Sequence, residues 1–100
     1  VIGVMKDKDY KTVLKATLPF CRSAVAVTVE DMPRTLEASE LAETAAYYCP
    51  TVTAGNYDEA LKKAASLANN DPVFVFGSLY LAGGIRDKLI DFYKKFFSTT

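Results

Sequence analysis

The chain has 100 residues, half of them hydrophobic, and its 12 Lys and Arg residues balance its 12 Asp and Glu residues. This length allows one small domain with a single core and excludes a second domain. The charge balance gives no bulk electrostatic reason to expect a nucleic-acid partner or an acidic membrane. Histidine is absent, which removes the usual general base and the Ser-His and Cys-His pairs of nucleophilic catalysis.

Four short runs of β-branched and aromatic residues predict strands. They are "VIGVM" (1–5), "SAVAVTV" (23–29), "TVTAG" (51–55) and "VFVFG" (73–77). Runs that are apolar on both faces suit strands that are covered on both sides. The four runs therefore favour a sheet buried inside the domain.

Between these runs, hydrophobic residues recur with helical spacing and predict four helices, each with one buried face. The members of the four stripes are Tyr10, Val13, Leu14, Thr17 and Leu18; Ala38, Leu41, Ala42, Ala45, Ala46 and Cys49; Tyr57, Ala60, Leu61, Ala64, Ala65 and Ala68; and Ala82, Ile85, Leu89, Ile90, Tyr93 and Phe97. The small alanines of the second and third stripes allow those helices to approach the sheet closely.

Local signals mark where these helices begin and end. Asp9 is a natural N-cap for the first helix, and Pro19 closes it. Asn56 and Glu59 have the spacing of a capping box at the start of the third helix, and "NNDP" (69–72) supplies the residues that end it. The order is βαβαβαβα, which implies right-handed crossovers and a three-layer α/β domain with a mostly parallel sheet.

In parallel sheets of this kind, ligands collect outside the carboxyl ends of the strands. That rule selects four segments: "KDKDY" (6–10), "VEDMPRT" (29–35), "AGNYD" (54–58) and "GSLY" (77–80). We expect all four to share one edge of the domain.

Ser78 occupies the most informative of these positions, because it lies between a buried strand and a helix. Its hydroxyl can simply cap the helix. Alternatively, the hydroxyl and the amides of the first turn can receive a carboxylate or phosphate. The preceding Gly77 allows the backbone to approach closely. Both interpretations remain open at this point.

Charged residues near the other strand ends have similar ambiguity. Lys8 is either solvated or reaches toward an anion across the strand ends. Arg34, held in the turn "MPRT" (32–35) by Pro33, either supports the turn or grips a carboxylate or phosphate with its planar guanidinium.

Cys21 and Cys49 are far apart in sequence, and neither has a second cysteine at metal-ligand spacing. This favours free thiols in a reducing compartment over a disulfide between the two, and it argues against a zinc site. No apolar run approaches the ~20 residues of a membrane-spanning helix, and the first residues lack the pattern of a signal peptide. We expect a cytoplasmic protein that does not engage a membrane.

Four longer segments carry a resemblance that covers nearly the whole chain. They are "VIGVMKDKDYKTVLKATLP", "MPRTLEASELAE", "AGNYDEALKKA" and "VFVFGSLYLAGGIRDKL". In this order and spacing they resemble the carboxyl-terminal domain of folylpolyglutamate synthase/dihydrofolate synthase, in the Mur ligase superfamily. The chain is expected to be a fragment, residues 1–100, of one such glutamate-ligase domain.

The resemblance implies a Rossmann-like fold and a ligase activity. Enzymes of this family join L-glutamate to a reduced folate or to dihydropteroate, using ATP and Mg²⁺ through an acyl phosphate. Their amino-terminal ATPase domain supplies the phosphate-binding loop and the metal ligands. Their carboxyl-terminal domain closes over the nucleotide and helps to receive glutamate.

The resemblance also assigns roles to individual residues. Ser78 is placed near the incoming glutamate, while Asp7, Lys8, Asp9 and Arg34 are placed on the rim that faces the interdomain cleft. It assigns no catalytic residue and no metal ligand to this chain. Whether the parent enzyme uses folate, dihydropteroate or both is left open.

Two departures from the family pattern matter. The phosphate-loop motif G-x-x-x-x-G-K-[ST] is absent, and so is the D-G-A-H-N-P segment of the interdomain junction, which is expected upstream of Val1. We therefore expect the chain alone to bind neither ATP nor Mg²⁺ and to lack ligase activity. A missing first strand-helix unit would leave a strand edge and a helix-binding face uncovered, so self-association is also expected.

Two other interpretations fit the same residues. The chain could be a stand-alone α/β module that binds a small anion or docks on a protein partner. It could also belong to another Mur-type amino-acid ligase, in which a different amino-terminal pocket selects the acceptor.

Overall fold

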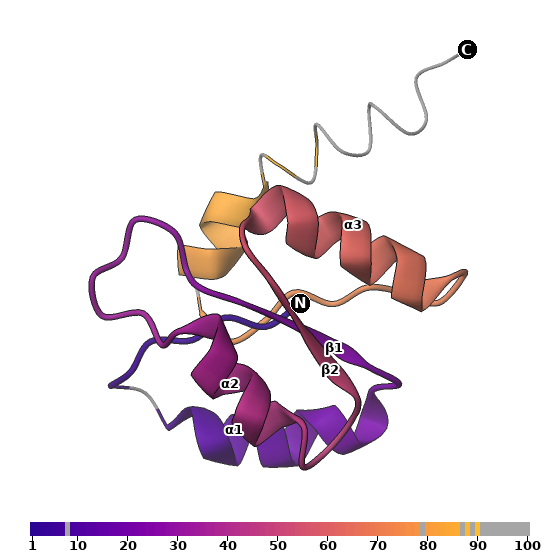
Figure 1. Cartoon of the computed structure of the whole chain (residues 1–100), viewed down its shortest axis with the longest axis horizontal. Coiled ribbons are helices and arrows are strands. Elements are labelled where there is room, and N and C mark those ends of the chain that lie inside the picture. Colours follow the sequence, from indigo (N-terminus) through magenta and orange to yellow (C-terminus); the bar gives the residue numbers. More distant parts are fainter. Residues whose placement is uncertain (8, 79, 87, 89, 91–100) are drawn as a thin grey trace.

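The computed structural model describes residues 1–7, 9–78, 80–86, 88 and 90. Its labelled elements are, in chain order, α1 (Tyr10–Thr17), the 3-10 helix η1 (Leu18–Phe20), β1 (Ala24–Val27), α2 (Ala38–Ala45), β2 (Thr51–Ala54) and α3 (Tyr57–Ala68). Residues 80–86 are also helical. Figure 1 shows α1 and α2 on one side of the strands and α3 with the 80–86 helix on the other.

The two strands form a small parallel sheet. Ala24 lies opposite Thr51 and Val27 opposite Ala54, so the four residues of β1 are in register with the four of β2. Parallel strands need a crossover connection, and α2 provides it. The predicted mixed α/β class and the parallel pairing of these two strands are confirmed.

The predicted strands over 1–5 and 73–77 are present only as isolated bridges. Ile2 makes one parallel bridge to Ala26 and another to Phe76, so both segments run in the same direction as β1. A regular ladder does not continue beyond Ile2, because the carbonyl of Val4 accepts a hydrogen bond from the Leu36 amide instead (2.9 Å). The end of the first segment is thereby diverted to the loop that precedes α2.

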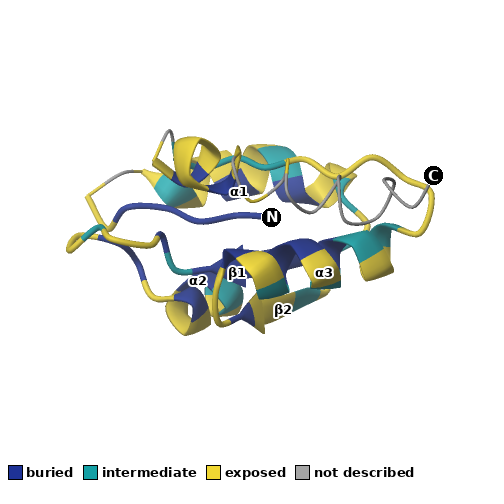
Figure 2. Ribbon diagram, turned by 90° about the horizontal axis from the view of Figure 1, so that it is seen from above, coloured by how far each residue is buried: buried dark blue, intermediate teal, exposed yellow. Residues whose placement is uncertain are grey.

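Hydrophobic side chains form two clusters, one for each side of the strands. The cluster on the α3 side contains Val1, Met5, Val25, Val27, Val29, Ala54, Tyr57, Ala60, Leu61, Ala64, Leu81 and Ile85. The cluster on the α1 and α2 side contains Ile2, Val4, Leu14, Leu18, Ala24, Ala26, Leu36, Leu41, Ala45 and Cys49. The valines of β1 thus face one cluster and its alanines the other, and all four are buried, as Figure 2 shows for β1 and the amino-terminal segment.

The first three predicted helices are confirmed, with some errors in which residues they bury. Val13 and Ala46 were assigned to buried stripes but are exposed. In the 80–86 helix, Leu81 and Ile85 reach the core, whereas Ala82 faces solvent. Ile90, another predicted member of that stripe, is also exposed (45%). Leu89, Tyr93 and Phe97 lie outside the described residues.

Both cysteines are unpaired, Cys49 in the core and Cys21 at its margin. Burial raises the pKa of the Cys49 thiol above its usual value, so this group stays protonated at neutral pH. Within the described part of the chain, no helix has the length and apolar character needed to cross a membrane.

Candidate functional site

The carboxyl ends of the parallel segments gather at one edge, which we call the rim: residues 5–7, 29–35, 54–58 and 77–78. In Figure 1 the rim lies toward the left, where the loop before α2 and the turn before α1 emerge. This arrangement follows from parallel pairing, because strands that run in one direction all end on the same side.

Gly77 joins the last segment of the sheet to the rim in a conformation that requires glycine. Its φ angle is 112°, and a Cβ at this position would lie 2.7 Å from the carbonyl oxygen of Gly3. The junction is therefore pressed against Gly3 and Val4 of the amino-terminal segment.

Ser78 caps the helix that follows it. Its hydroxyl oxygen accepts hydrogen bonds from the amides of Tyr80 (3.1 Å) and Leu81 (3.4 Å), and its carbonyl accepts one from Ala82 (3.1 Å). The cap interpretation is thus confirmed. The hydroxyl proton is not used in these bonds, since the oxygen accepts in both, so it can still be donated to a ligand.

Arg34 and Asp7 lie next to each other on the rim, Arg34 in the loop before α2 and Asp7 in the turn before α1. The Arg34 Nη1 atom lies 3.1 Å from Asp7 Oδ2, and the two side chains are 72% and 49% exposed. The carbonyl of Arg34 also accepts a hydrogen bond from the Lys6 amide (2.8 Å). An incoming anion at Arg34 would therefore compete with a carboxylate of the chain itself.

The remaining predicted rim residues have different outcomes. Asp9 is the N-cap of α1: its carboxylate accepts from the Thr12 amide (3.4 Å) and from the Thr12 hydroxyl (2.7 Å). This accounts for Asp9 without a ligand. Lys8 lies outside the described residues.

A pair of residues that the sequence interpretation did not single out connects two parts of the rim. The Tyr57 amide donates to Glu30 Oε2 (2.9 Å), and the Glu30 amide donates to the Tyr57 hydroxyl (2.8 Å). Tyr57 is the first residue of α3, and Glu30 follows β1, so this reciprocal pair holds the start of α3 against the loop after β1. We call it the Glu30–Tyr57 clamp.

The ring of Tyr57 also contacts the 80–86 helix. A Cβ on Gly84 would lie 2.8 Å from Tyr57 Cε2, so the glycine provides the space that the ring fills. Gly83, by contrast, has nothing within 4 Å of where its Cβ would be. Gly84 therefore allows the Tyr57 ring to pack against this helix, and Gly83 does not contribute to that contact.

Electrostatics keep the Tyr57 phenol neutral. Burial raises its pKa above the usual value near 10, and the Glu30 and Asp31 carboxylates act in the same direction. The hydrogen bond from the Glu30 amide opposes this shift but is the smaller effect. At neutral pH the phenol is an acceptor for that amide and retains a proton that it can donate.

The rim carries groups of mixed charge. Its cations are Lys6 and Arg34, its carboxylates are those of Asp7, Glu30, Asp31 and Asp58, and its hydroxyls include those of Ser78 and Tyr57. Among the residues that the structure describes, no group of three or more acidic or cysteine side chains could hold a metal ion.

Comparisons with known proteins give no match for this chain: no protein-family model, no curated protein and no solved structure matches it. The functional interpretation therefore depends on the geometry of the rim and on the resemblance carried by the quoted segments.

Proposed function

We propose that the chain is part of an ATP-dependent ligase that adds L-glutamate to a folate or to dihydropteroate. In this proposal it forms most of a three-layer, Rossmann-like carboxyl-terminal domain. The observation that carries the proposal is Ser78: a donor hydroxyl at the carboxyl end of a parallel segment, in the "GSLY" position where the resemblance expects glutamate.

The geometry of Ser78 supports a role in binding a carboxylate. Its oxygen already accepts from the Tyr80 and Leu81 amides, which leaves the hydroxyl proton for donation to a ligand. A carboxylate that accepts this proton would also benefit from the positive end of the same helix. No base accompanies Ser78, so it binds and orients the amino acid and does not act as a nucleophile.

The other partners belong to the rest of the proposed enzyme. ATP and Mg²⁺ would be bound by an amino-terminal ATPase domain of the same polypeptide, because this chain lacks a phosphate-binding loop. The contribution of the rim is then to close against that domain, exclude water and hold the glutamate amine in position. Arg34 is the residue of the rim that is suited to face a phosphate or a second carboxylate.

Two substitutions at Ser78 separate glutamate binding from helix capping in the intact enzyme. Ser78→Ala removes both functions and is expected to raise the apparent KM for glutamate about tenfold or more. Ser78→Asp retains a good N-cap but places a negative charge where the carboxylate binds, so it should raise this KM at least as much while preserving stability. The KM for ATP should change much less.

The matched control is Ser66→Ala, an exposed serine on α3 that should leave both constants unchanged. If Ser78→Asp binds glutamate as well as the unmodified enzyme does, Ser78 is only a cap and the proposed role is wrong. Arg34→Ala is a second test, in which a raised KM for ATP would support a phosphate contact.

A stand-alone anion-binding module is the second candidate, favoured by the absence of a complete catalytic set in this chain. The coding sequence upstream of Val1 distinguishes the two. The ligase proposal requires a phosphate-binding loop and the D-G-A-H-N-P junction there, and the module requires neither. The 100-residue chain alone should release no phosphate from ATP in the presence of glutamate and folate, and measurable release would contradict the proposed division of labour.

A further inference from the structure

We propose that Tyr57 is a positioning residue for the Ser78 site. The Tyr57 side chain determines where the 80–86 helix lies on the rim, and so where the Ser78 hydroxyl is held. The choice of glutamate as the ligand at Ser78 rests on the proposed function, but the structural link between Tyr57 and Ser78 does not.

Tyr57 is held at both its backbone and its phenol. Its amide donates to Glu30 Oε2 (2.9 Å), and its hydroxyl oxygen accepts from the Glu30 amide (2.8 Å). Because both points are tied to the loop after β1, the ring between them cannot turn aside without losing a hydrogen bond. The ring is therefore a fixed support on this part of the rim.

The 80–86 helix lies against that ring. A Cβ on Gly84 would be 2.8 Å from Tyr57 Cε2 and 3.3 Å from the Tyr57 hydroxyl oxygen, so the helix backbone is as close to the ring as a glycine allows. Leu81 and Ile85 anchor the same helix in the hydrophobic cluster that contains Tyr57. The ring and the core together therefore fix the position of the helix.

Ser78 depends on that position, because its hydroxyl is bonded to the first turn of this helix. The oxygen accepts from the Tyr80 amide (3.1 Å) and from the Leu81 amide at 3.4 Å, which is longer than most hydrogen bonds of this kind. Tyr80 and Gly84 are only about 6 Å apart along a helix axis. A shift of the helix at Gly84 would therefore reach the cap and lengthen a bond that is already long.

The chain before Ser78 does not move with the helix. Gly77 has a φ of 112° and is pressed against Gly3, whose carbonyl oxygen would lie 2.7 Å from a Cβ at Gly77. Ser78 thus lies between a fixed junction and a helix whose position Tyr57 sets. A displacement of the helix is taken up at Ser78 and changes the direction in which its hydroxyl can donate.

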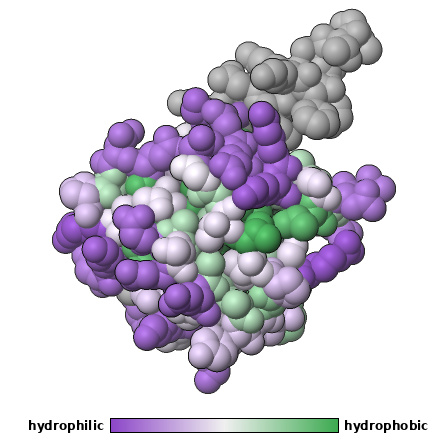
Figure 3. All heavy atoms as spheres, in the orientation of Figure 1, coloured by the Kyte–Doolittle hydropathy of each residue, from purple (hydrophilic) through white to green (hydrophobic). Residues whose placement is uncertain are grey.

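Tyr57 acts through the helix because a ligand cannot reach its ring. The residue is 4% exposed. Figure 3 shows hydrophilic residues over the start of α3 on the visible face, where the 80–86 helix lies beside α3 in Figure 1. Tyr57 is covered by other residues, so it affects a ligand at Ser78 by positioning and not by contact.

The first test forces the helix away from the ring in the 100-residue chain. Gly84→Ala places a methyl group against Tyr57, so amide hydrogen exchange at Leu81 should become at least about tenfold faster. Without the ring, the same change would slow this exchange, since alanine favours a helix more than glycine does. Gly83→Ala is the matched control: its Cβ would meet nothing within 4 Å, and it should not accelerate the exchange.

An amide in the sheet serves as the internal reference. The Val27 amide donates to the Ile2 carbonyl (2.9 Å). Global destabilisation accelerates exchange at both Val27 and Leu81, whereas a displaced helix accelerates exchange at Leu81 alone. The quantity to compare is therefore the ratio of the Leu81 rate to the Val27 rate. An unchanged ratio in folded Gly84→Ala would overturn the proposal.

The second test keeps the ring but releases it. Tyr57→Phe removes the hydroxyl that ties the ring to the Glu30 amide, so it should raise the Leu81-to-Val27 ratio severalfold. This variant decides the question if Gly84→Ala does not fold.

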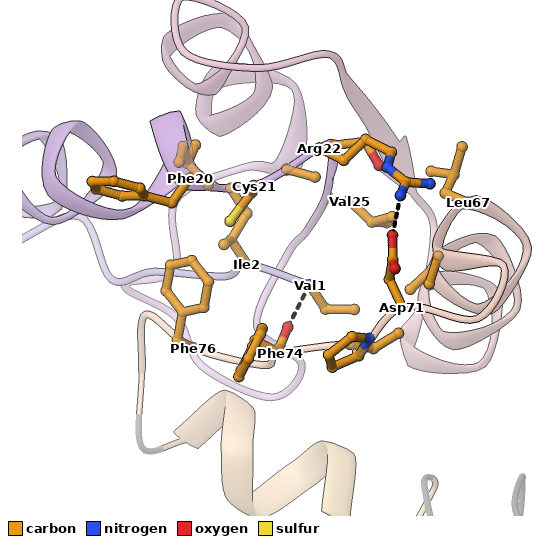
Figure 4. Close-up of a pocket in the computed structure, with 17 residues that line it drawn as sticks. Val1, Ile2, Phe20, Cys21, Arg22, Val25, Leu67, Asp71, Phe74 and Phe76 are labelled. Carbon is orange, nitrogen blue, oxygen red and sulfur yellow. Dashed lines mark hydrogen bonds and ion pairs between the residues drawn. The ribbon is translucent and has the colours of Figure 1, made fainter.

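A destabilised control for Tyr57→Phe lies at the opposite end of α3. Ala64 and Leu67 line the cavity of about 420 Å³ shown in Figure 4, whose lining contains no residue of the 80–86 helix. Ala64→Gly lowers stability because glycine is unfavourable within a helix, and it should leave the exchange ratio unchanged. Equal ratios in Ala64→Gly and Tyr57→Phe would overturn the proposal.

In the intact enzyme, the same contact should affect glutamate binding. Gly84→Ala should raise the KM for glutamate about tenfold and leave the KM for ATP within about twofold of its original value. Combined with Ser78→Ala it should have little further effect, since both changes act through one hydroxyl. Fully additive effects in the double variant would overturn the proposal.

Failure of this proposal can be distinguished from failure of the proposed function. If Ser78→Ala leaves the KM for glutamate unchanged, the proposed function is wrong, and the exchange ratio still decides whether Tyr57 positions Ser78. If Ser78→Ala raises this KM and Gly84→Ala does not, glutamate binds as proposed but Tyr57 does not position the site.

Discussion

The two ends of the sheet differ in whether their exposed groups already have partners within the chain. At the rim, polar groups already have partners within the chain: Arg34 pairs with Asp7, and Glu30 and Tyr57 are joined by two hydrogen bonds. At the opposite end, where the parallel segments begin, large apolar side chains such as Phe20 remain in water. A polar site can be organised before its ligand arrives, whereas an apolar surface gains its free energy only when something covers it.

This difference separates two kinds of substitution effect. Changes at the rim should alter the free energy of unfolding, because the rim groups support the fold as well as any ligand. A change at Phe20 should leave the free energy of unfolding almost unchanged, since that side chain is 91% exposed. The five predictions below test the rim, and the substitutions are taken in order of decreasing effect on stability.

Gly77→Ala should have the largest effect, a loss of about 3 kcal/mol in the free energy of unfolding. The alanine would adopt a φ of 112° that side chains rarely tolerate, and its Cβ would clash with the Gly3 carbonyl at 2.7 Å. Urea denaturation followed by circular dichroism measures the loss. Gly83→Ala is the matched control and should be stabilising by up to about 1 kcal/mol, because its Cβ meets nothing within 4 Å in a helical segment. Equal stabilities for the two variants would show that the junction is not strained as described.

Tyr57→Phe should cost about 1–2 kcal/mol, because the Glu30 amide loses the phenol oxygen that accepts its proton. Tyr47→Phe removes an exposed hydroxyl and should stay within about 0.5 kcal/mol of the unmodified chain. A loss no greater than that of the control would mean that the clamp does not stabilise the rim.

The difference in unfolding free energy between the unmodified chain and Tyr57→Phe should depend on pH. The folded pKa of Tyr57 is raised, so the neutral phenol contributes stability that is fully present below the usual value near 10 and is lost as the pH rises through the folded pKa. Tyr57→Phe lacks this titration. The difference in unfolding free energy between the two proteins should therefore shrink above about pH 10. A difference that stayed constant up to pH 11 would contradict the raised pKa.

Local signals were enough to predict the helices of this fold. The stripe from Tyr57 to Ala68 and the capping residue Asn56 predicted α3 with its observed bounds, because helix periodicity and capping depend on residues three or four positions apart. The extent of the strands was not predictable in this way. The segment 1–5 leaves the sheet after Ile2 because of Leu36, a partner that no local pattern indicates.

The candidate site shows the same limit. The cap at Ser78 was predictable from its position between a strand and a helix, and it is present. The Glu30–Tyr57 clamp joins residues 27 positions apart, and Tyr57 looked like an ordinary member of a buried stripe. Only the three-dimensional arrangement shows that the Tyr57 hydroxyl joins two segments of the rim and that its ring fills the space left by Gly84 in the 80–86 helix.

Ser78→Ala should reduce stability by about 1 kcal/mol, the usual contribution of a serine N-cap. Ser78→Asp should stay within a few tenths of the unmodified chain, because aspartate caps as well as serine and suits the helix dipole. Thermal or urea unfolding of the 100-residue chain measures both. If Ser78→Asp destabilised the chain as much as Ser78→Ala, aspartate would not replace serine as the cap, and the separation of capping from glutamate binding would fail.

Arg34→Ala should have the smallest effect on folding, less than about 0.5 kcal/mol, because its ion pair with Asp7 is largely exposed. A double-mutant cycle with Asp7→Asn measures the coupling, which should vanish in 1 M NaCl, where charges are screened within about 3 Å. A coupling above 1 kcal/mol that survived salt would make the pair a structural element of the turn. A small coupling instead leaves Arg34 able to exchange Asp7 for an anionic ligand at little cost, which is the property that an anion-binding rim requires.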